Sequence, residues 1–388
     1  MQIRQLTERD FDEQISLSEF AFQYRLSADE RDAKREKFRP EQSWGAFDEQ
    51  DRLLSQLTIL PLECWVGGRA LKMGGIAGVS TWPEARRMNC VTQLLANSLS
   101  HMREQGQTIS MLHPFSVPFY RKFGWELTIE QKKYEVETAL LPKRKDEPGR
   151  MEAIDKRGES LNELYETFAS TYQGALKRDA DWWANRVLVK PGRVSAWRNE
   201  GGALEGYLFY EAKEGVVTVR DWAALNEEAR SALWTFLANH DSMAKTIRLE
   251  APIDDGLSFL LPDPRGVRQE VHSYFMSRIV DVEGFVRQYP FAEAPANEEL
   301  TIRVTDEHAP WNHNVFKITW EKDGTASAAA TEGEAEASCH IRALAAMLLG
   351  NRRPQWLYRS GLLAGSPEAA KLLERRIPAH TPFLPDFF

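Results

Sequence analysis

The stretch GGIAGVSTWPEARRMNCVTQLL, residues 74–95, decides the fold. It begins inside a segment, residues 70–82, whose small and apolar residues are typical of a strand. After Pro83 the apolar residues recur at helical spacing up to Gly106, where a helix is expected to end. The first backbone N–H groups of such a helix have no partner within it. The stretch therefore predicts a strand, an anion-binding turn and a helix.

Two arginines, Arg86 and Arg87, lie in that turn and are followed by Asn89. Their guanidinium groups, together with the free N–H groups of the helix start, suit a phosphate ligand. The alternative is a solvated surface pair without a ligand. Arginine at a helix N-terminus opposes the macrodipole at a cost of roughly 0.3–1 kcal/mol, which a bound pyrophosphate would reverse. We therefore favour a pyrophosphate site.

The segments around this motif alternate between strand and helix. We expect a strand over residues 3–6, a helix from an N-cap at Thr7 to about residue 24, antiparallel strands over 44–47, 53–64 and 70–82, a strand over 108–112, and a short helix over 118–123. The order predicts a mixed α/β sheet at the start of an α+β chain.

Composition and charge limit the class of protein. A chain of 388 residues exceeds one ordinary hydrophobic core, so two or three domains are expected. The net charge of −8 argues against nucleic acid or an anionic membrane as the main partner. Cys64, Cys90 and Cys339 are widely spaced and odd in number, which indicates neither a disulfide framework nor a metal cluster. With no apolar signal core and no run of about 18 apolar residues, we expect a cytoplasmic protein without membrane spans.

The last residues, TPFLPDFF over 381–388, are apolar and aromatic. Chain ends are usually polar and frayed unless something holds them. Two phenylalanines beside the free carboxylate predict a buried terminus.

A second stretch, GVVTVRDWAALNEEARSALWTFL over residues 215–237, repeats the plan of residues 74–95. It has Glu227 and Glu228 near the helix start in place of the two arginines, so it would repel a pyrophosphate. We expect this copy to be structural. The charged segment 140–150 is a predicted linker.

The remainder of the chain has weaker signals. Residues 315–320 alternate like a strand, and residues 340–349 have helical spacing. The small and acidic segment 323–339 is expected to form a strand and loop on the surface.

Taken with PFYRKFGWE over residues 118–126, the Arg86-Arg87-Met88-Asn89 turn resembles the GNAT (Gcn5-related N-acetyltransferase) fold. Within that fold the whole chain, including its FLPDFF end, is similar to the enhanced-intracellular-survival (Eis) acetyltransferases. The resemblance implies a GNAT domain over residues 1–150, a degenerate GNAT-like domain over 151–285, and a sterol-carrier-protein-like domain over 286–388. It also implies a homo-oligomer, often a hexamer, that uses acetyl-CoA and no metal.

The resemblance also implies the roles of individual residues. The acetyl-CoA site would consist of Val79, Ser80, Thr81, Arg87, Met88, Asn89, Cys90, Val91, Thr92, Phe115 and Ser116. Backbone groups of Val79 and Thr81, where the strand splays open, would bind the acetyl and pantetheine part. Tyr120 would donate a proton or hydrogen bond to the departing thiolate, and the carboxylate of Phe388 would accept the amine proton.

Three positions depart from the family pattern. Asn89 stands where the first glycine of the pyrophosphate loop is expected, and asparagine is the non-glycine residue that best tolerates unusual backbone angles. Val91 stands where another small residue is common in the family. Phe387 is not an acid, so a cationic pocket must take its charge from Asp386 or elsewhere.

Ordinary pKa values restrict the chemistry. A carboxyl near 3.5 is too weak to deprotonate an amine near 10.5 before attack, a gap of about 7 units. The terminal carboxylate is therefore expected to accept the proton from the tetrahedral intermediate. A phenol near 10 facing a thiolate near 8.5 leaves only about 1.5 units, which a hydrogen bond can offset.

Each singled-out side chain has an ordinary alternative. Without the family match, Tyr120 is a core aromatic. Cys90 is more readily a buried filler than a nucleophile, because no His/Asp arrangement accompanies it. Core packing is likewise the simpler role for the three tryptophans Trp44, Trp182 and Trp183. For the two histidines, His101 and His113, a catalytic role is the less favoured alternative.

The residues and the family resemblance together predict an N-acetyltransferase that moves acetyl from acetyl-CoA directly to a primary amine. The resemblance implies that aminoglycosides, polyamines or lysine-like side chains are the acceptors. The acceptor and the position of transfer stay open at this point. A different class of function is an acetyl-CoA-sensing, lipid- or protein-binding scaffold that uses the sterol-carrier-like domain.

Overall fold

The computed structural model describes residues 1–142, 145–155, 161–350 and 352–388. Most strands belong to one large sheet. Its strands are β1 (Gln2–Gln5), β2 (Ser43–Phe47), β3 (Leu53–Val66), β4 (Arg69–Thr81), β5 (Ile109–Leu112), β6 (Glu126–Glu137), β7 (Gly149–Ile154), β8 (Arg193–Asn199), β9 (Leu204–Lys213), β10 (Val216–Ala224), β11 (Thr246–Ala251) and β12 (Val267–Ile279). Their order is β1-β2-β3-β4-β5-β12-β6-β11-β10-β9-β8-β7.

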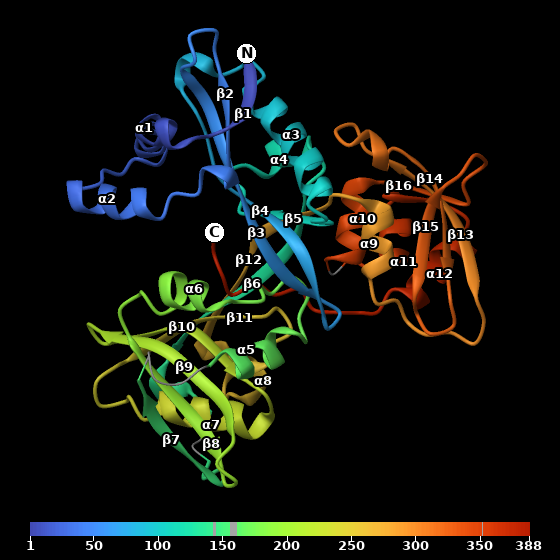
Figure 1. Ribbon diagram of the computed structural model, residues 1–388. Coiled ribbons are helices and arrows are strands. Elements are labelled where there is room, and N and C mark those ends of the chain that lie inside the picture. Colours follow the sequence, from blue (N-terminus) through green and yellow to red (C-terminus); the bar gives the residue numbers. More distant parts are fainter. Residues whose placement is uncertain (143–144, 156–160, 351) are drawn as a thin grey trace.

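Eight helices of the described chain accompany this sheet. They are α1 (Phe11–Phe22), α2 (Ala28–Glu36), α3 (Cys90–Glu104), α4 (Val117–Arg121), α5 (Asn162–Ala169), α6 (Ala180–Trp182), α7 (Glu227–Ala238) and α8 (Leu257–Leu260). Figure 1 shows α1 to α4 around the blue N-terminal strands and α5 to α8 around the green and yellow strands. Two structural units therefore share one sheet.

Strand β12 joins the two units. It follows β11 in the chain yet pairs antiparallel with β5 on one side and with β6 on the other. The second half of β6, residues 132–137, pairs with β11 as well. Strands on both sides of residue 150 thus belong to one sheet, and the boundaries at residues 150 and 285 stay predictions. Residues 143 and 144 of the predicted linker lie outside the described residues.

Local sequence signals account for much of the first unit. Strands β2, β3 and β4 form the predicted antiparallel meander. The turn between β3 and β4 has Gly67 and Gly68 at φ of 52° and 78°, the left-handed backbone that a tight hairpin needs. Thr7 and Asp10 form a capping box before α1, as predicted. No strand was predicted for β6 and no helix for α2.

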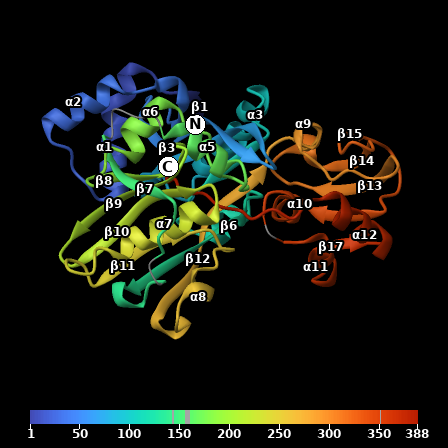
Figure 2. The ribbon, with the colours of Figure 1, turned by 90° about the horizontal axis from the view of Figure 1, so that it is seen from below.

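The third unit is a smaller sheet with its own helices (Figure 2). Its strands are β13 (Glu298–Thr305), β14 (Asn314–Trp320), β15 (Ala326–Ala330), β16 (Ala337–His340) and β17 (Leu363–Gly365), in the order β15-β14-β13-β16-β17. Its helices are α9 (Val282–Gln288), α10 (Ile341–Leu348), α11 (Pro354–Arg359) and α12 (Pro367–Arg376).

The prediction of a surface strand and loop over residues 323–339 is wrong at its C-terminal end. Strand β16 lies inside the sheet, parallel to β13 and antiparallel to β17. Ala337 and Cys339 are buried because small side chains of an interior strand fit against the helices that cover the sheet.

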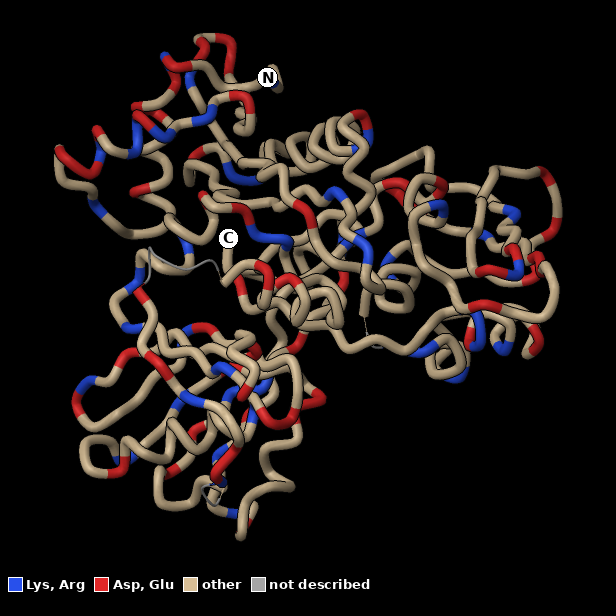
Figure 3. Tube along the Cα trace, turned by 60° about the horizontal axis from the view of Figure 1, so that its bottom comes forward, with Lys and Arg blue, Asp and Glu red and all other residues tan. Residues whose placement is uncertain are grey.

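A buried ion pair fixes the third unit to the large sheet. Arg278 at the end of β12 is fully buried and donates hydrogen bonds of 2.8 and 2.7 Å to the carboxylate of Asp306. Helix α10 also lies against β6 and β12. Elsewhere basic and acidic residues are interspersed over all three units (Figure 3). No helix in the described part of the chain has the length and apolar character that crossing a membrane requires.

The C-terminal tail returns to the middle of the molecule. After α12 it runs back from the third unit and ends between the first and second units, where both ribbon views place the C-terminus. On the way it bonds to Gln173: the N–H of Gln173 donates to Thr381 O, and the N–H of Phe383 donates to Gln173 O. The predicted burial of the terminus is confirmed, since Phe388 is only 8% exposed.

Candidate active site

Strand β4 has an irregularity near its C-terminal end. Its pairing with β3 shifts register between Gln56 and Thr58, and the opposing Gly78 has φ of 62°. Glycine supplies the left-handed backbone of this bulge, and bulges often re-aim strands next to active sites. Strand β4 pairs with β5 only from Met73 to Gly75. Beyond Gly75 the two parallel strands part.

The turn between β4 and α3 has the backbone of an anion site. Arg87 and Asn89 both adopt left-handed conformations, with φ of 68° and 66°. Asn89 therefore takes the backbone angle for which a glycine is otherwise used. Helix α3 has no side-chain cap and no acid in its first turn, so its N-terminal N–H groups are available to an anion. Within the described chain, neither Arg86 nor Arg87 pairs with a carboxylate.

A cleft of about 840 Å³ lies over this turn and the bulge. Its lining comes from β4, the turn, α3 and the segment after β5, with a further contribution from α1. The lining residues are Ala21, Phe22, Val79, Ser80, Thr81, Ala85, Arg86, Arg87, Asn89, Cys90, Val91, Thr92, Phe115 and Phe119. Of the residues predicted to bind acetyl-CoA, only Met88 and Ser116 are absent from this lining. Met88 is 53% exposed, and Ser116 is the N-cap of α4.

Four lining residues were not predicted: Ala21 and Phe22 at the end of α1, Ala85 in the turn before α3, and Phe119 in α4. Phe22 and Phe115 are 53% and 70% exposed, which is unusual for aromatic side chains in one cleft. Exposed apolar groups that gather in this way mark ligand sites. Phe119 lies inside the PFYRKFGWE motif, so that motif was the available signal, whereas nothing in the α1 sequence indicated contact with β4.

Tyr120 lies behind the cleft wall. It is 2% exposed, and its ring contacts Phe115, Phe119 and Trp125 at centroid distances of 5.3, 5.2 and 6.4 Å. Burial raises the pKa of the phenol. The group therefore keeps its proton at neutral pH and can act as a hydrogen-bond donor.

Phe388 lies where β4 and β5 part. A Cβ on Gly75 would come within 2.8 Å of the Phe388 ring, so this ring packs directly on the glycine. The same ring lies 4.8 Å from that of Phe275 in β12 and 6.4 Å from that of Trp182 in α6. Residues from both units thus surround the end of the chain.

Hydrogen bonds hold the tail in this position. Gln131 in β6 donates to Leu384 O at 2.6 Å, and the Tyr274 hydroxyl donates to Asp386 O at 2.9 Å. Phe387 is 57% exposed and contacts the ring of His113 at 5.0 Å. Burial, and then the nearby His272, lower the pKa of His113, so its imidazole is neutral at pH 7.

The remaining singled-out residues have packing roles. Cys90 is 2% exposed, and burial raises its thiol pKa, so it is no activated nucleophile. Trp44 contacts the ring of His101 at 5.3 Å beside α3. Trp183 donates its indole N–H to Asn162. Trp182 is different, because it touches Phe388.

The second unit repeats the strand and helix without the turn. Strand β10 pairs parallel with β11 over Val216–Thr218, as β4 does with β5 over the same length. Only residues 225 and 226 separate β10 from α7. Asn226 caps α7 by accepting a hydrogen bond from Ala229 N, and Glu227 and Glu228 occupy the first turn. This helix start is therefore closed to an anion.

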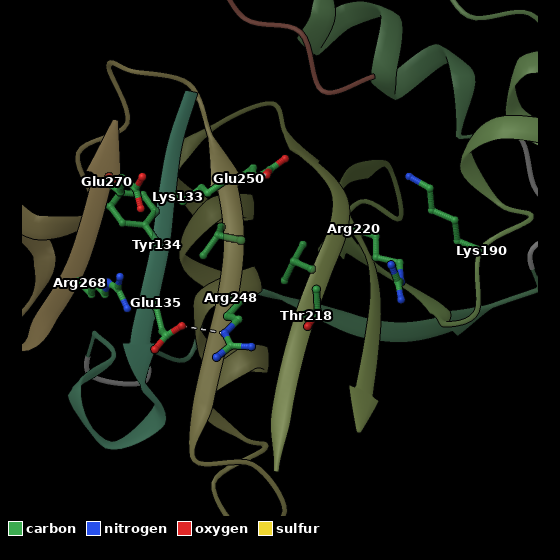
Figure 4. Close-up of a pocket in the computed structure, with 12 residues that line it drawn as sticks. Lys133, Tyr134, Glu135, Lys190, Thr218, Arg220, Arg248, Glu250, Arg268 and Glu270 are labelled. Atoms are coloured by element: carbon green, nitrogen blue, oxygen red, sulfur yellow. Dashed lines mark hydrogen bonds and ion pairs between the residues drawn. The ribbon is translucent and has the colours of Figure 1, made fainter. Parts of the chain in front are cut away.

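A cleft of about 430 Å³ does cross this part of the sheet, over β6, β10, β11 and β12 (Figure 4). Its charges are of both signs and partly paired: Arg248 bonds to Glu135 at 2.8 Å, and Lys133 lies 3.9 Å from Glu250. The apolar side chains of these strands pack on the other face, against α7. The cleft is a solvated charged face without a phosphate-binding turn.

Comparison with known proteins identifies the family. A family model described as an acetyltransferase (GNAT) domain matches residues 2–128, and another with the same description matches residues 174–279. A model described as a sterol carrier protein domain matches residues 282–385. The chain belongs to the GNAT N-acetyltransferases. Two GNAT domains followed by a sterol carrier domain give this acetyltransferase the Eis-like architecture that the sequence predicted.

Individual relatives agree with this assignment. An uncharacterized N-acetyltransferase of Streptomyces avermitilis is 27% identical over 379 residues, covering 90% of this chain and 89% of the relative. A probable N-acyltransferase from Enterococcus faecalis V583 superposes with a TM-score of 0.93 at 26% identity, over 100% of this chain and 99% of the other. Eis1 from Mycobacterium abscessus shares the fold, with a TM-score of 0.82 at 22% identity over 100% of both chains. Membership of the GNAT family implies use of acetyl-CoA.

Proposed function

We propose that this acetyltransferase transfers the acetyl group of acetyl-CoA directly to a primary amine, with Phe388 as the proton acceptor. The position of Phe388 carries the proposal. Its ring packs on Gly75, and Val79 of the cleft lies four residues further along the same strand. Four strand residues span about 13 Å. This spacing supports a reaction centre in the strand opening, between the terminal residue and the cleft.

The cleft has the right chemistry for acetyl-CoA. The pyrophosphate would lie at the α3 start, held by backbone N–H groups and by Arg86 and Arg87. The pantetheine arm would follow the backbone of residues 79–81 past the bulge. The aromatic side chains Phe22 and Phe115 would cover apolar parts of the ligand.

The transfer needs no covalent enzyme intermediate. The amine nitrogen bonds to the thioester carbonyl carbon, the C–S bond then breaks, and the thiol leaves. The amine proton becomes far more acidic once the nitrogen is bonded to carbon, so the weak carboxylate of Phe388 can accept it at that stage. Because its pKa is raised, Tyr120 would stabilise the departing thiolate by a hydrogen bond rather than by full proton transfer.

The tail also bears on the choice of amine. Phe387 presents an aromatic ring where an acid would attract a polycation, and the buried carboxylate of Asp386 is already bonded to Arg178. Aminoglycosides, polyamines and lysine-like side chains are the acceptors that the family resemblance suggests. The ring contacts of Phe387 and His113 favour, among amines, one with a single positive charge and an apolar body. Assembly into a homo-oligomer or hexamer stays an expectation.

Thiol release from acetyl-CoA tests the proposal. The intact chain is assayed with aminoglycosides, polyamines and arylalkylamines, beside a variant extended by one glycine after Phe388. We expect turnover by the intact chain and its loss in the extended one, while acetyl-CoA still binds to both. Equal turnover by both proteins would show that the tail is a structural plug.

The scaffold alternative has its own signature. A protein that only senses acetyl-CoA or binds lipid through its sterol carrier domain would bind hydrophobic ligands and release no thiol with any amine. The buried terminus argues against it, because a carrier has no need of a chain end held beside the β4–β5 opening.

A further inference from the structure

We propose that Arg178, between α5 and α6, is a positioning residue that sets the catalytic terminus by holding Asp386, and that this is a function of the second GNAT domain. The inference rests on the proposed role of the Phe388 carboxylate. Arg178, Asp221 and Asp386 form what we term the tail latch.

The latch is a fully engaged, buried ion network. The Arg178 side chain is 1% exposed. Its Nε donates to both carboxylate oxygens of Asp386, at 3.0 and 3.1 Å. Its Nη1 and Nη2 donate to Asp221 in β10, at 2.8 and 3.1 Å. One guanidinium thus links the second domain to the tail through two carboxylates.

Neighbouring side chains complete the network. Trp182 donates its indole N–H to Asp386 at 2.8 Å, and Tyr207 donates its hydroxyl to Asp221 at 2.7 Å. The Tyr165 ring lies 3.8 Å from the guanidinium carbon, and its hydroxyl lies 3.3 Å from the Asp386 carboxylate. Burial lowers the pKa of Arg178, but the two carboxylates more than offset this and hold it well above the ordinary value. The guanidinium therefore stays charged, and each charge has partners.

The distance along the chain explains why the latch matters. Asp386 is two residues from Phe388, and two extended residues span about 7 Å at most. Fixing Asp386 therefore fixes the small region that the terminal carboxylate can reach. Catalytic groups lose rate when they are misplaced by as little as about 1 Å.

The second domain supplies the other half of the latch. Asp221 follows a register shift in the pairing of β10 with β9, between Val219 and Asp221. This irregularity lies in the strand that repeats β4, where the first domain has its Gly78 bulge. The second domain has thus kept a bulged strand and uses it to bind the tail rather than a cofactor.

The test compares two carboxylates of similar setting. Asp386→Asn removes the one charged side chain of the FLPDFF segment and leaves a balanced Arg178–Asp221 pair, so the fold should survive. Asp306→Asn is the matched control, because it weakens another buried Arg–Asp pair, that of Arg278, away from the tail. Each variant is assayed for kcat, for the KM of acetyl-CoA and of the amine, for Tm, and for release of Phe388 by a carboxypeptidase.

We expect Asp386→Asn to lower kcat about tenfold or more, with the KM of acetyl-CoA within about twofold. Carboxypeptidase should release Phe388 from this variant far faster than from the unaltered chain. Asp306→Asn should lower Tm while leaving kcat and tail protection unchanged. Arg178→Lys keeps a positive charge that can donate to Asp386. Its kcat should lie between those of the unaltered chain and of Asp386→Asn.

Two results would overturn the latch: unchanged kcat and tail protection in Asp386→Asn, or losses in both Asn variants that simply follow Tm. The glycine-extended chain separates this failure from that of the proposed function. If the extension is harmless, the terminal carboxylate is not the proton acceptor. If the extension abolishes turnover while Asp386→Asn has no effect, only the latch is wrong. Tail protection measures the latch without reference to turnover.

Discussion

The two GNAT domains share a parallel strand followed by a helix, but they differ in the connection between these two elements. Residues 82–89 connect β4 to α3, whereas residues 225 and 226 alone connect β10 to α7. The α3 start is uncapped, and the α7 start is capped by Asn226 and followed by two glutamates. The comparison teaches that a few turn residues decide whether the helix start is open to an anion, while the parallel strand pairing is retained in both domains.

A second difference concerns the opening between the parallel strands. In the first domain Phe388 packs on Gly75 where β4 and β5 part. In the second domain the Trp222 indole donates a hydrogen bond to Glu250 O and bridges β10 and β11. One opening thus receives the chain terminus, and the other is closed by its own side chain.

Charge reversal at the α3 start should have the largest effect on the KM of acetyl-CoA, and the same change at the α7 start should have almost none. Arg86→Glu with Arg87→Glu would remove the two proposed charge-assisted hydrogen bonds to the pyrophosphate, so the KM of acetyl-CoA should rise about 100- to 10,000-fold. The matched change in the second domain, Glu227→Arg with Glu228→Arg, should alter that KM by about twofold at most. Steady-state kinetics of both double variants check this. A comparable loss in the second pair would end the distinction between the domains.

The substitution Tyr120→Phe should have the next largest effect on the reaction. It deletes the proposed hydrogen bond to the departing thiolate, so kcat should fall about 10- to 100-fold while the KM of acetyl-CoA stays within about twofold. Tyr134→Phe is the control, since that hydroxyl bonds to Asp255 O in the core of the second domain. Equal kcat values for both variants would return Tyr120 to the role of a core aromatic.

Gly75→Ala tests the opening itself. The new Cβ would lie 2.8 Å from the Phe388 ring, so the ring must shift and kcat should fall about tenfold. In the second domain Gly256→Ala meets no atom within 4 Å and should leave kcat unchanged. Kinetics of the two variants, with Tm as a check on folding, decide the matter. An unaffected Gly75→Ala enzyme would mean that the terminal ring has no fixed place.

Lowering the pH should have the smallest effect, a modest fall in Tm. Burial lowers the pKa of His113 and of His272 below 6.5, so the unfolded chain binds protons more readily than the folded one as pH falls through that value. The contribution of these two histidines to the free energy of unfolding is therefore fully present above about pH 6.5 and is lost as the pH falls below it. Between pH 7.5 and 5.5 we expect Tm to fall by roughly 2 °C.

The matched variant for the pH effect is His113→Asn with His272→Asn. It should reduce the dependence of Tm on pH in this window, where carboxylates with ordinary or lowered pKa values stay ionised. His380, whose pKa burial also lowers, should account for the remaining slope. A slope that is the same in the variant would assign the effect to other groups.

Local signals explain how much of this could be predicted from sequence. The β4–α3 turn is a continuous segment whose arginines, apolar spacing and terminal glycine all lie within residues 74–106, so the strand, turn and helix were predicted from the residues themselves. Most of the cleft lining was predicted through the family resemblance. The burial of Phe388 followed from the apolar chain end. Helix α2 was missed even though Ser27 and Glu30 form a capping box, because its remaining residues have no apolar face.

What sequence patterns missed depends on distant partners. Strand β12 inserts between β5 and β6, and no local pattern specifies which strands will pair. Arg178 finds Asp221 and Asp386 at separations of 43 and 208 residues, and each residue alone is typical of a solvated surface. The tail latch could be recognised only when the three side chains were seen together.

Calorimetric titration with acetyl-CoA tests most directly the central claim that one GNAT domain binds the cofactor and the other does not. The account predicts one site per chain, lost in the Arg86→Glu, Arg87→Glu variant and retained in the Glu227→Arg, Glu228→Arg variant. Two sites per chain, or one site that survives the arginine replacements, would contradict it.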